Sequence, residues 1–518
     1  MRPSATTIVW RPVYPGVGFS IVSASVSRYG GARREIPRRC RATEGGHGAS
    51  NTDVRLTDPV PLGRRNRRTK ASPQQPRSGM IQTWILSIAF CMMSAPTSCQ
   101  QNQFQRTLVS LDIQVVDDIV VGGKLPLPYT EPHLAADRLD PDHLLVASIV
   151  GFTRDRDQSR WGCAIMVSRN GGASWSERRL DLGRCADPWV ALDGEDAWFA
   201  SLHDLRGGDH GLAVYGSSDG GSSWDPEPVV VGRGHDHPTM VFDDRGGVYV
   251  IANYLSRRRS FVSVFPLDVS GLPQRRFLQA TPAVANTLEP VVTRDGEVVV
   301  LLSEFSRFVN GRQERIEPSR IGATTFLPDR ASFTELRAVT RRCGSGNRKG
   351  FGGSAIDESG GRFDERIYLA CIGLRAGDIV VVSSDDGGAT WGSPVRVLGF
   401  PEPEVEGTPL RRAPGIAVNR DGAVAVVWQD RGDDPDRRCQ VQKFAVSVDG
   451  GASFSDPVNL SSARSCPDTR RNRSAARQWP AGSDYGSIVA LSDGRFRSVW
   501  ADARNGIYQV RMATVAVR

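Results

Sequence analysis

The sequence lacks the short motifs that mark several large functional classes. Its 518 residues contain no phosphate-binding loop, no GxSxG nucleophile turn, no HExxH metal motif and no dinucleotide fingerprint. None of its nine cysteines is part of a CxxC pair, and no group of histidines lies near them, which argues against a structural zinc site. The sequence therefore gives no sign of nucleotide-dependent, serine-hydrolase or zinc-protease chemistry.

The chain also has no excess of positive charge beyond its first 79 residues. The whole chain has 65 Lys and Arg against 57 Asp and Glu. Residues 1–79 hold 15 and 4 of these, and subtracting them leaves 50 basic and 53 acidic residues in 80–518. The only dense basic cluster, Arg64–Lys70, lies in that first segment. Nucleic-acid binding needs a basic face on a folded domain, so we expect no nucleic-acid partner.

Long helices are not expected, because the chain contains 54 Gly and 32 Pro. Residues 1–79 show no hydrophobic period that would bury a core, and we expect them to stay unfolded. They form either a genuine basic arm or a stretch upstream of a real start at Met80.

Residues 80–99 have the form of an export signal. The apolar run Met80–Met93 is too short to span a bilayer, and small residues follow it up to Cys99. Cys99 after Thr97 and Ser98 resembles the end of a lipoprotein signal, although Pro96 stands where Leu is usual. We therefore expect a secreted, periplasmic or surface-lipoprotein monomer, with membrane contact only through the signal or a lipid on Cys99.

Six cysteines remain after the signal. Taken as sequential pairs they are separated by 22, 28 and 27 residues, and the first and third pairs each bracket one glycine-rich segment. Sequential pairing is our prediction among the fifteen connectivities that six cysteines allow, and it requires an oxidising compartment. The predicted pairs are Cys163 with Cys185, Cys343 with Cys371, and Cys439 with Cys466.

The strongest signal is an internal repeat of the form Ser-x-Asp-Gly-Gly-x-Ser/Thr-aromatic. The Asp can accept turn N–H groups, the glycines can adopt positive φ, and the aromatic residue can pack back over the turn. The motif therefore predicts a hairpin. Its main positions are Ser168, Asn170, Gly172 and Trp175; Ser217, Asp219, Gly221 and Trp224; Ser384, Asp386, Gly388 and Trp391; and Ser447, Asp449, Gly451 and Phe454.

These repeats resemble the Asp-boxes, or bacterial neuraminidase repeats, of the sialidase superfamily. The resemblance implies a β-propeller in which each box joins the two outer strands of a blade, away from the ligand site. Asn170 replaces Asp in the first box and Phe454 replaces Trp in the last, and both substitutes could keep the turn and its packing.

A second repeated element lies between the boxes: a short apolar strand, an acidic or glycine turn, and then a β-rich run. About seven copies occur, which predicts an all-β propeller of about seven, alternatively six, four-stranded blades over residues 105–518. The last unit lacks a full outer hairpin, and the early strand Leu111–Val116 could pair there and close the ring. The copies begin at Pro132, Pro188, Pro238, Pro290, Ser354, Pro414 and Ser487.

Ionisable residues gather just before these inner strands, at the phase where ligands commonly bind in propellers. Acidic residues before Pro also favour turns, so each residue alone carries little weight, and the set carries more. As ligand-binding candidates we take Glu131, His133, Asp236, His237, Arg412 and Arg342, and as catalytic candidates Tyr485, Asp484, Glu289 and Asp187.

The resemblance implies, for an active sialidase, an Arg triad on the substrate carboxylate, a Tyr nucleophile paired with a Glu, and an Asp acid/base. The first unit reads Glu131-Pro132-His133 where that family has its first Arg, so no triad can be assigned here. We therefore expect recognition of a glycan or another extracellular ligand at the channel mouth. Alternatives are an exo-α-sialidase or related glycosidase and a protein-binding scaffold. No cofactor is expected, apart from structural calcium held by the mouth carboxylates as an alternative.

Overall fold

The computed structural model describes residues 112–518 with short gaps. These gaps are 123–126, 152–160, 181–184, 205–209, 244, 257–258, 268–272, 274, 311, 341–342, 344–351, 374–377, 399–410, 433, 435, 437, 473–474 and 476–478. All described residues belong to one compact unit, 103–518. The proposed basic leader, the signal and Cys99 lie outside the described residues, as does Arg342.

The described residues form seven antiparallel sheets. Six are four-stranded blades and one has six strands. In the first three blades the strands are β2 (Tyr129–Ala136), β3 (Leu144–Gly151), β4 (Trp161–Ser168) and β5 (Ser176–Leu180); β6 (Cys185–Asp193), β7 (Asp196–Asp204), β8 (His210–Ser217) and β9 (Val229–Arg233); and β10 (His235–Phe242), β11 (Val248–Ser256), β12 (Arg259–Leu267) and β13 (Phe277–Thr281).

The fourth sheet is the irregular one. It contains β14 (Val284–Thr287), β15 (Val291–Val292), β16 (Val298–Val309), β17 (Arg312–Leu327), β18 (Ser332–Phe333) and β19 (Arg337–Thr340), with the 3₁₀ turn η1 (Pro328–Arg330) between β17 and β18. The inner strand of this sheet is split into β14 and β15, which both pair with β16, and the outer strand is split into β18 and β19, which both pair with β17.

The last three blades are regular. They contain β20 (Gly353–Ile356), β21 (Ile367–Ile372), β22 (Ile379–Ser384) and β23 (Val395–Leu398); β24 (Arg411–Val418), β25 (Val424–Asp430), β26 (Val441–Ser447) and β27 (Val458–Asn459); and β28 (Ser487–Ala490), β29 (Phe496–Asp502), β30 (Gln509–Val517) and β1 (Ile113–Gly122). A single-turn helix, α1 (Thr469–Asn472), lies between β27 and β28.

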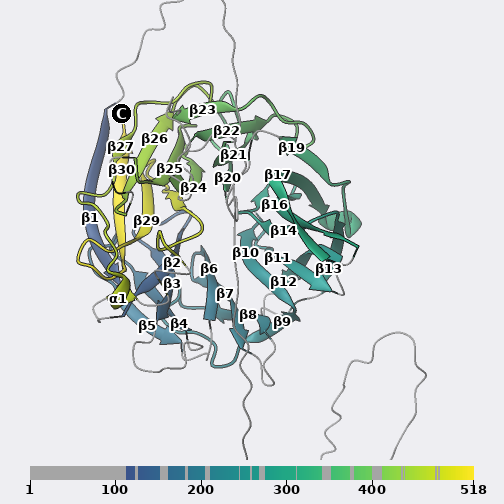
Figure 1. The fold of residues 1–518 in the computed structure, drawn as a ribbon, viewed down its shortest axis with the longest axis horizontal. Helices are drawn as coiled ribbons and strands as arrows, with labels where there is room; N and C mark the ends of the chain where they lie inside the picture. Colours follow the sequence, from purple (N-terminus) through teal and green to yellow (C-terminus); the bar gives the residue numbers. More distant parts are fainter. Residues whose placement is uncertain are drawn as a thin grey trace, which may run out of the picture. The chain divides into compact units, whose positions relative to one another are not determined.

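The innermost strands contact one another in a closed circle. β2 contacts β6, β6 contacts β10, and the circle continues through β14 and β15, β20, β24 and β28 back to β2. Figure 1 shows the sheets arranged radially around this axis. The all-β propeller predicted from the repeats is confirmed, and each predicted unit supplies one inner strand. The prediction of four strands per blade holds for six sheets, and the fourth sheet departs from it.

The core is divided into layers between neighbouring sheets. One layer joins the first two blades through Ile165, Phe199 and Tyr215, and another joins the last two through Phe444 and Phe496. A single blade would expose both faces, so stacking around the circle supplies the burial that each sheet needs.

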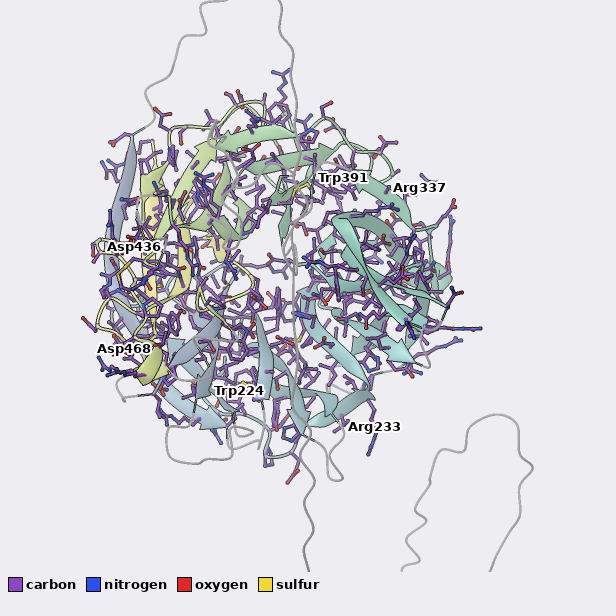
Figure 2. All side chains as sticks on the ribbon, viewed as in Figure 1. Trp224, Arg233, Arg337, Trp391, Asp436 and Asp468 are labelled. Atoms are coloured by element: carbon purple, nitrogen blue, oxygen red, sulfur yellow. A yellow bond between two sulfur atoms is a disulfide. The ribbon has the colours of Figure 1, made fainter. Side chains whose placement is uncertain are left out.

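The four Asp-box motifs form the turns between the third and fourth strands of their blades. In the third box the Asp386 Oδ1 accepts the Ser384 hydroxyl at 2.8 Å and the Thr390 N–H at 2.8 Å. Gly388 has φ 87°. Glycine adopts this backbone conformation readily because it lacks a side chain. The box tryptophans Trp224 and Trp391 come from blades well separated around the ring (Figure 2).

The two divergent boxes make the same turn by small adjustments. Asn170 Oδ1 accepts the Ser174 N–H at 2.9 Å, as an aspartate would. Its amide then donates to the Ser174 hydroxyl at 2.8 Å, reversing the direction of the bond that Ser223 donates to Asp219. Phe454 packs against the core between the fifth and sixth blades.

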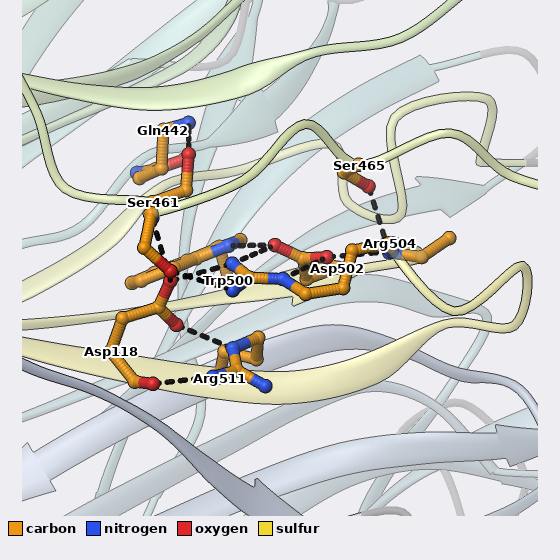
Figure 3. A network of polar contacts seen from close by, with 10 residues as sticks. Asp118, Gln442, Ser461, Ser465, Trp500, Asp502, Arg504 and Arg511 are labelled. Carbon is orange, nitrogen blue, oxygen red and sulfur yellow. Dashed lines mark hydrogen bonds and ion pairs between the residues drawn. The ribbon is translucent and has the colours of Figure 1, made fainter.

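The ring closes by pairing the two ends of the described chain. β1 pairs antiparallel with β30, with Ile113 opposite Val517. The predicted closing strand is therefore confirmed, and it extends to Gly122. Asp118 reinforces this junction, because its carboxylate accepts from Arg504 at 2.6 Å, from Arg511, and from the Ser462 N–H at 2.7 Å (Figure 3).

The three disulfides are those predicted from the spacing. Cys163–Cys185 joins the first blade to the second, and Cys343–Cys371 joins the fourth sheet to the fifth blade. Cys439–Cys466 links the segments on either side of β26 and β27. Three disulfides are consistent with an oxidising, extracellular setting. Among the described residues, no helix has the length and apolar character needed to cross a bilayer.

Candidate functional site

The inner strands share a bulge near their starts, and this bulge builds the channel mouth. The register shifts between Thr130 and His133 in β2, and at the corresponding place in β6, β10 and β24. The residue before Pro in each bulge is left-handed: Glu131, Asp187, His237 and Ala413 have φ between 49° and 52°. A left-handed residue that is not glycine costs about 1–3 kcal/mol and often lies at a functional site.

Ala413 shows that this bulge is first of all architectural. It has the same conformation as the three ionisable residues but carries no functional group. The bulge therefore turns each inner strand at the mouth, and the side chain at that position decides what the mouth presents. Ala490 pairs with Phe496 in the last blade as Val418 pairs with Val424 in the sixth. Counting back five residues from each, Tyr485 occupies the position that Ala413 has in the sixth blade.

Glu289 does not share this position, although its sequence context predicted that it would. Val292 pairs with Val298 as Phe242 pairs with Val248 in the third blade, so the fourth-sheet residue equivalent to His237 is Thr287. The Thr287 hydroxyl donates to the His237 carbonyl at 2.6 Å. Glu289 follows two residues later, farther along the channel.

Tyr485 reaches across the channel to the first two blades. Its hydroxyl lies 3.3 Å from the carbonyl oxygens of Glu131 and Pro188, to which it donates. Burial raises the pKa of Tyr485 well above its usual value, and the negative charges of Glu131, Asp187 and Asp484 add to the shift. This setting keeps the phenol protonated.

An aromatic stack lies beside Tyr485. The His133 ring stacks on Trp189 with centroids 3.6 Å apart, and Trp189 lies 5.9 Å from the Tyr485 ring. His133 Nδ1 accepts the Val190 N–H at 3.3 Å, and burial lowers the pKa of His133 to about 3. His133 is thus neutral and packed, which makes it part of the wall more than a titrating ligand group. Trp189, like Trp198, Trp428 and Trp500, is buried in the core.

Two carboxylates and an imidazole converge on one side of the mouth. Ligand atoms of Asp187, Asp236 and His237 all lie within 4.8 Å of one another. Carboxylates with an imidazole suit zinc or manganese better than calcium. The binding of structural calcium at the mouth carboxylates stays a prediction. In the described part of the chain, Glu131 and Glu289 are not members of this group.

Two arginines meet on the other side of the mouth. Arg412 lies in β24, and Arg431 follows the end of β25. Burial lowers the pKa of both guanidinium groups. The charge of Arg412 lowers the pKa of Arg431 further, while Asp484 partly offsets the shift at Arg412. The buried Nε of each arginine has no hydrogen-bond partner among the described residues.

The nearest buried acid on these strands is already engaged. Asp430 pairs with Arg411 across the strands at 2.7 Å, with both side chains buried. It also accepts the Trp428 indole N–H at 3.0 Å. Arg431 is held in place by donating to the Pro480 carbonyl at 2.8 Å, and its Nε donor has no partner among the described residues.

The structure brings seven of the predicted site residues together, and their binding and catalytic roles stay predictions. Glu131, Asp187, Asp236, His237, Arg412, Asp484 and Tyr485 lie around one mouth. Arg431 was missed, because it follows the second strand of its blade and the candidates were taken only from the residues before the inner strands. The available signal was its place at the end of a second strand, at the same edge of the blade as Arg412.

Comparisons with known proteins give weak structural similarities. No family model matches the chain, and no curated protein matches it. A Hadza microbial sialidase aligns with a TM-score of 0.43 and 13% identity, covering 75% of this chain and 65% of that one, so this chain spans less than two thirds of its length.

Two further solved structures show the same level of similarity. An ulvan lyase, a polysaccharide lyase, aligns with a TM-score of 0.46 and 10% identity over 77% of this chain and 95% of that one. A Trypanosoma rangeli sialidase mutant aligns with a TM-score of 0.38 and 11% identity over 78% and 58%. The fold assignment itself rests on the sheets, their circular contacts and the box turns. In architecture the chain is an all-β propeller whose blades carry repeated Ser-x-Asp/Asn-Gly-Gly turns.

Proposed function

We propose that the channel mouth recognises a glycan that carries a carboxylate, with this carboxylate placed at Arg412 and Arg431. The observation that carries the proposal is the pair of buried guanidinium groups whose Nε atoms have no hydrogen-bond partner among the described residues. Two like charges held together out of water are costly, and a bound anion would relieve both their repulsion and their missing hydrogen bonds. Guanidinium groups bind carboxylates through paired hydrogen bonds.

The opposite side of the mouth fits the rest of a sugar. Sugar hydroxyls donate hydrogen bonds, and the carboxylates of Asp187 and Asp236 accept them. Both residues are only partly buried, so their oxygens can be reached from solvent. A ligand with one anionic group and several hydroxyls would match the basic side and the acidic side of the mouth together.

The alternative of an exo-α-sialidase or related hydrolase depends on Tyr485, which lies beside Glu131 and Asp484. Its hydroxyl donates to two backbone carbonyls, and the surrounding charges oppose formation of a phenolate. The geometry thus favours binding over nucleophilic catalysis by this group. Hydrolysis of a fluorogenic sialoside that is lost in Tyr485→Phe would establish the hydrolase instead.

The binding proposal can be tested on an array of sialylated, uronate-containing and neutral glycans. We expect acidic glycans to be retained and their neutral counterparts not. Arg431→Gln should weaken binding by about 10- to 100-fold, since a charge-assisted hydrogen bond contributes about 1.5–3 kcal/mol. Arg420→Gln is the matched control, because Arg420 is exposed and its guanidinium donates to the Ser492 carbonyl at 2.7 Å.

Equal retention of neutral and acidic glycans would contradict the proposal. So would unchanged binding by a folded Arg431→Gln protein. If a protein partner were captured instead, and loop exchanges abolished its binding while Arg431→Gln did not, the scaffold alternative would replace glycan recognition.

A further inference from the structure

A cavity occupies the channel, with a volume of about 320 Å³. It is lined by the inner strand of every sheet, and its lining ends at Arg138, Thr293 and Glu358. These residues follow the ends of β2, β15 and β20, whereas the mouth lies near the strand starts. The cavity therefore opens on the face of the propeller opposite the mouth.

Close packing separates this cavity from the mouth. Tyr485, Leu288 and Gly353 surround only a small void at the mouth end. A side chain at Gly353 would lie 3.0 Å from the backbone nitrogen of Ile416, so these inner strands approach too closely for anything larger than glycine. A ligand of the cavity would enter from the opposite face, independently of any glycan at the mouth.

Aliphatic side chains and polar groups share the walls of the cavity. Innermost strands also present to the axis the backbone groups of their unpaired edges. The cavity is thus a tube around the axis that offers both apolar side chains and carbonyl acceptors. Its apolar lining includes Ala135, Val190, Met240, Val292, Ile416 and Ile488.

Glu289 lies at the inner end of this tube and lines both the cavity and the small void beyond it. In the described part of the protein no hydrogen bond or neighbouring charge acts on its carboxyl group, and burial alone raises its pKa to about 8. Glu289 is partly buried and lines the cavity, and a bound cation at this end of the cavity would favour the ionised form of its carboxyl group.

We infer that the channel cavity binds a linear primary alkylammonium ion, with the ammonium group on Glu289 and the alkyl chain along the apolar walls. An ammonium group offers a positive charge and three donors, which match one carboxylate and nearby carbonyl oxygens. Each methylene buried in the tube adds about 0.8 kcal/mol. A neutral alcohol of the same length lacks the charge, and an alkyl carboxylate would be repelled.

The test is calorimetric titration of the full chain with hexylammonium chloride at pH 9, above the pKa of Glu289 and below that of a primary ammonium group. We expect one saturable site per chain, with hexan-1-ol binding at least about tenfold more weakly, which is 1.4 kcal/mol. Glu289→Gln keeps the shape and removes the charge, and it should weaken hexylammonium binding by a similar factor. Glu297→Gln, in the same sheet but away from the cavity, is the control and should bind as the wild type does.

The location can be read separately from methyl NMR of methionines. Hexylammonium should shift the Met240 methyl signal, because Met240 lines the cavity, and leave Met166 unchanged, because it packs between the last and first blades. Absence of binding, equal binding of hexan-1-ol, equal binding by folded Glu289→Gln, or a saturable shift at Met166 without one at Met240 would each overturn the inference.

Discussion

Replacing Asp118 by Asn is expected to loosen the closure of the ring. Asp118 lies on β1, and its carboxylate is the shared acceptor for Arg504, Arg511 and Ser462, which come from the C-terminal part of the propeller. Asn would still accept one or two of these bonds but would leave two largely buried guanidinium groups short of a counterion. Arg504 would keep the Asp502 carboxylate, at 2.8 Å, as its counterion, and its hydrogen bond to the Ser462 hydroxyl.

The expected loss is about 3 kcal/mol, near the lower end for removing one partner of a buried ion pair. Unfolding entropy of about 2.1 cal/mol/K per residue gives about 0.9 kcal/mol/K for a compact unit of about 400 residues. Asp118→Asn should therefore lower the Tm by about 3–4 °C in a thermal scan at pH 7. Asp112→Asn is the control, because Asp112 is exposed on the same chain segment and should shift the Tm by less than about 1 °C.

The effect should also depend on pH. Burial acts to raise the pKa of Asp118, but hydrogen bonds from Ser462, Arg511 and Arg504 outweigh it, so the pKa lies below its ordinary value of 3.8. A depressed carboxyl pKa stabilises the fold above the unfolded value and loses that contribution as the pH falls through the folded value. The Tm difference between wild type and variant should be full at pH 7 and shrink below about pH 4. An unchanged Tm at pH 7, or an equal loss in Asp112→Asn, would refute the reasoning.

Three further perturbations probe the packing, the cross-links and the channel. Gly486→Ala would press its new methyl group onto the carbonyl oxygen of Ala413 and should lower the Tm clearly, whereas Gly392→Ala, with only one backbone oxygen at 3.5 Å, should not. Replacing both cysteines of the Cys163–Cys185 disulfide by serine should cost about 3 kcal/mol in chemical denaturation, and no change in midpoint would contradict this. For Glu289 the folded pKa of about 8 lies above the unfolded value, so wild-type stability should fall as the pH rises toward 8; Glu289→Gln should be more stable than wild type at pH 9, and parallel pH profiles would rule this out.

The sequence predicts the architecture well because its signals are local. A turn motif such as Ser384–Trp391 contains both its donors and its acceptors within eight residues, so its hairpin is specified without knowledge of the rest. Regular spacing then sets the number of inner strands. The incomplete last unit calls for a closing strand, which was predicted at Leu111–Val116 and lies at Ile113–Gly122. The fourth sheet was not foreseen in detail, because its split strands follow no repeat.

The site was predicted less completely because its partners come from different blades. Glu131, Asp187 and His237 were found because they share one phase of the repeat. Arg431 lies in a connecting segment, and its meeting with Arg412 depends on the packing of two strand ends. Glu289 has the right sequence context, but the split inner strand of its sheet shifts it by two residues. The box turns are specified by residues within a few positions of one another, whereas side-chain contacts between blades can be read only from the three-dimensional structure.

The two proposed ligand sites should behave as independent units, because the channel is closed between them. Tyr485 and Trp189 lie between the mouth and the cavity and pack ring to ring, while Gly353 lets the neighbouring backbones touch. Groups without shared partners usually contribute additively. A double variant carrying Arg431→Gln and Glu289→Gln should therefore lose acidic-glycan binding and hexylammonium binding by the same factors as the single variants. If saturation with hexylammonium changed glycan affinity in the wild type, the packed layer around Tyr485 would have to transmit the change, and the mouth and the cavity would form one coupled site.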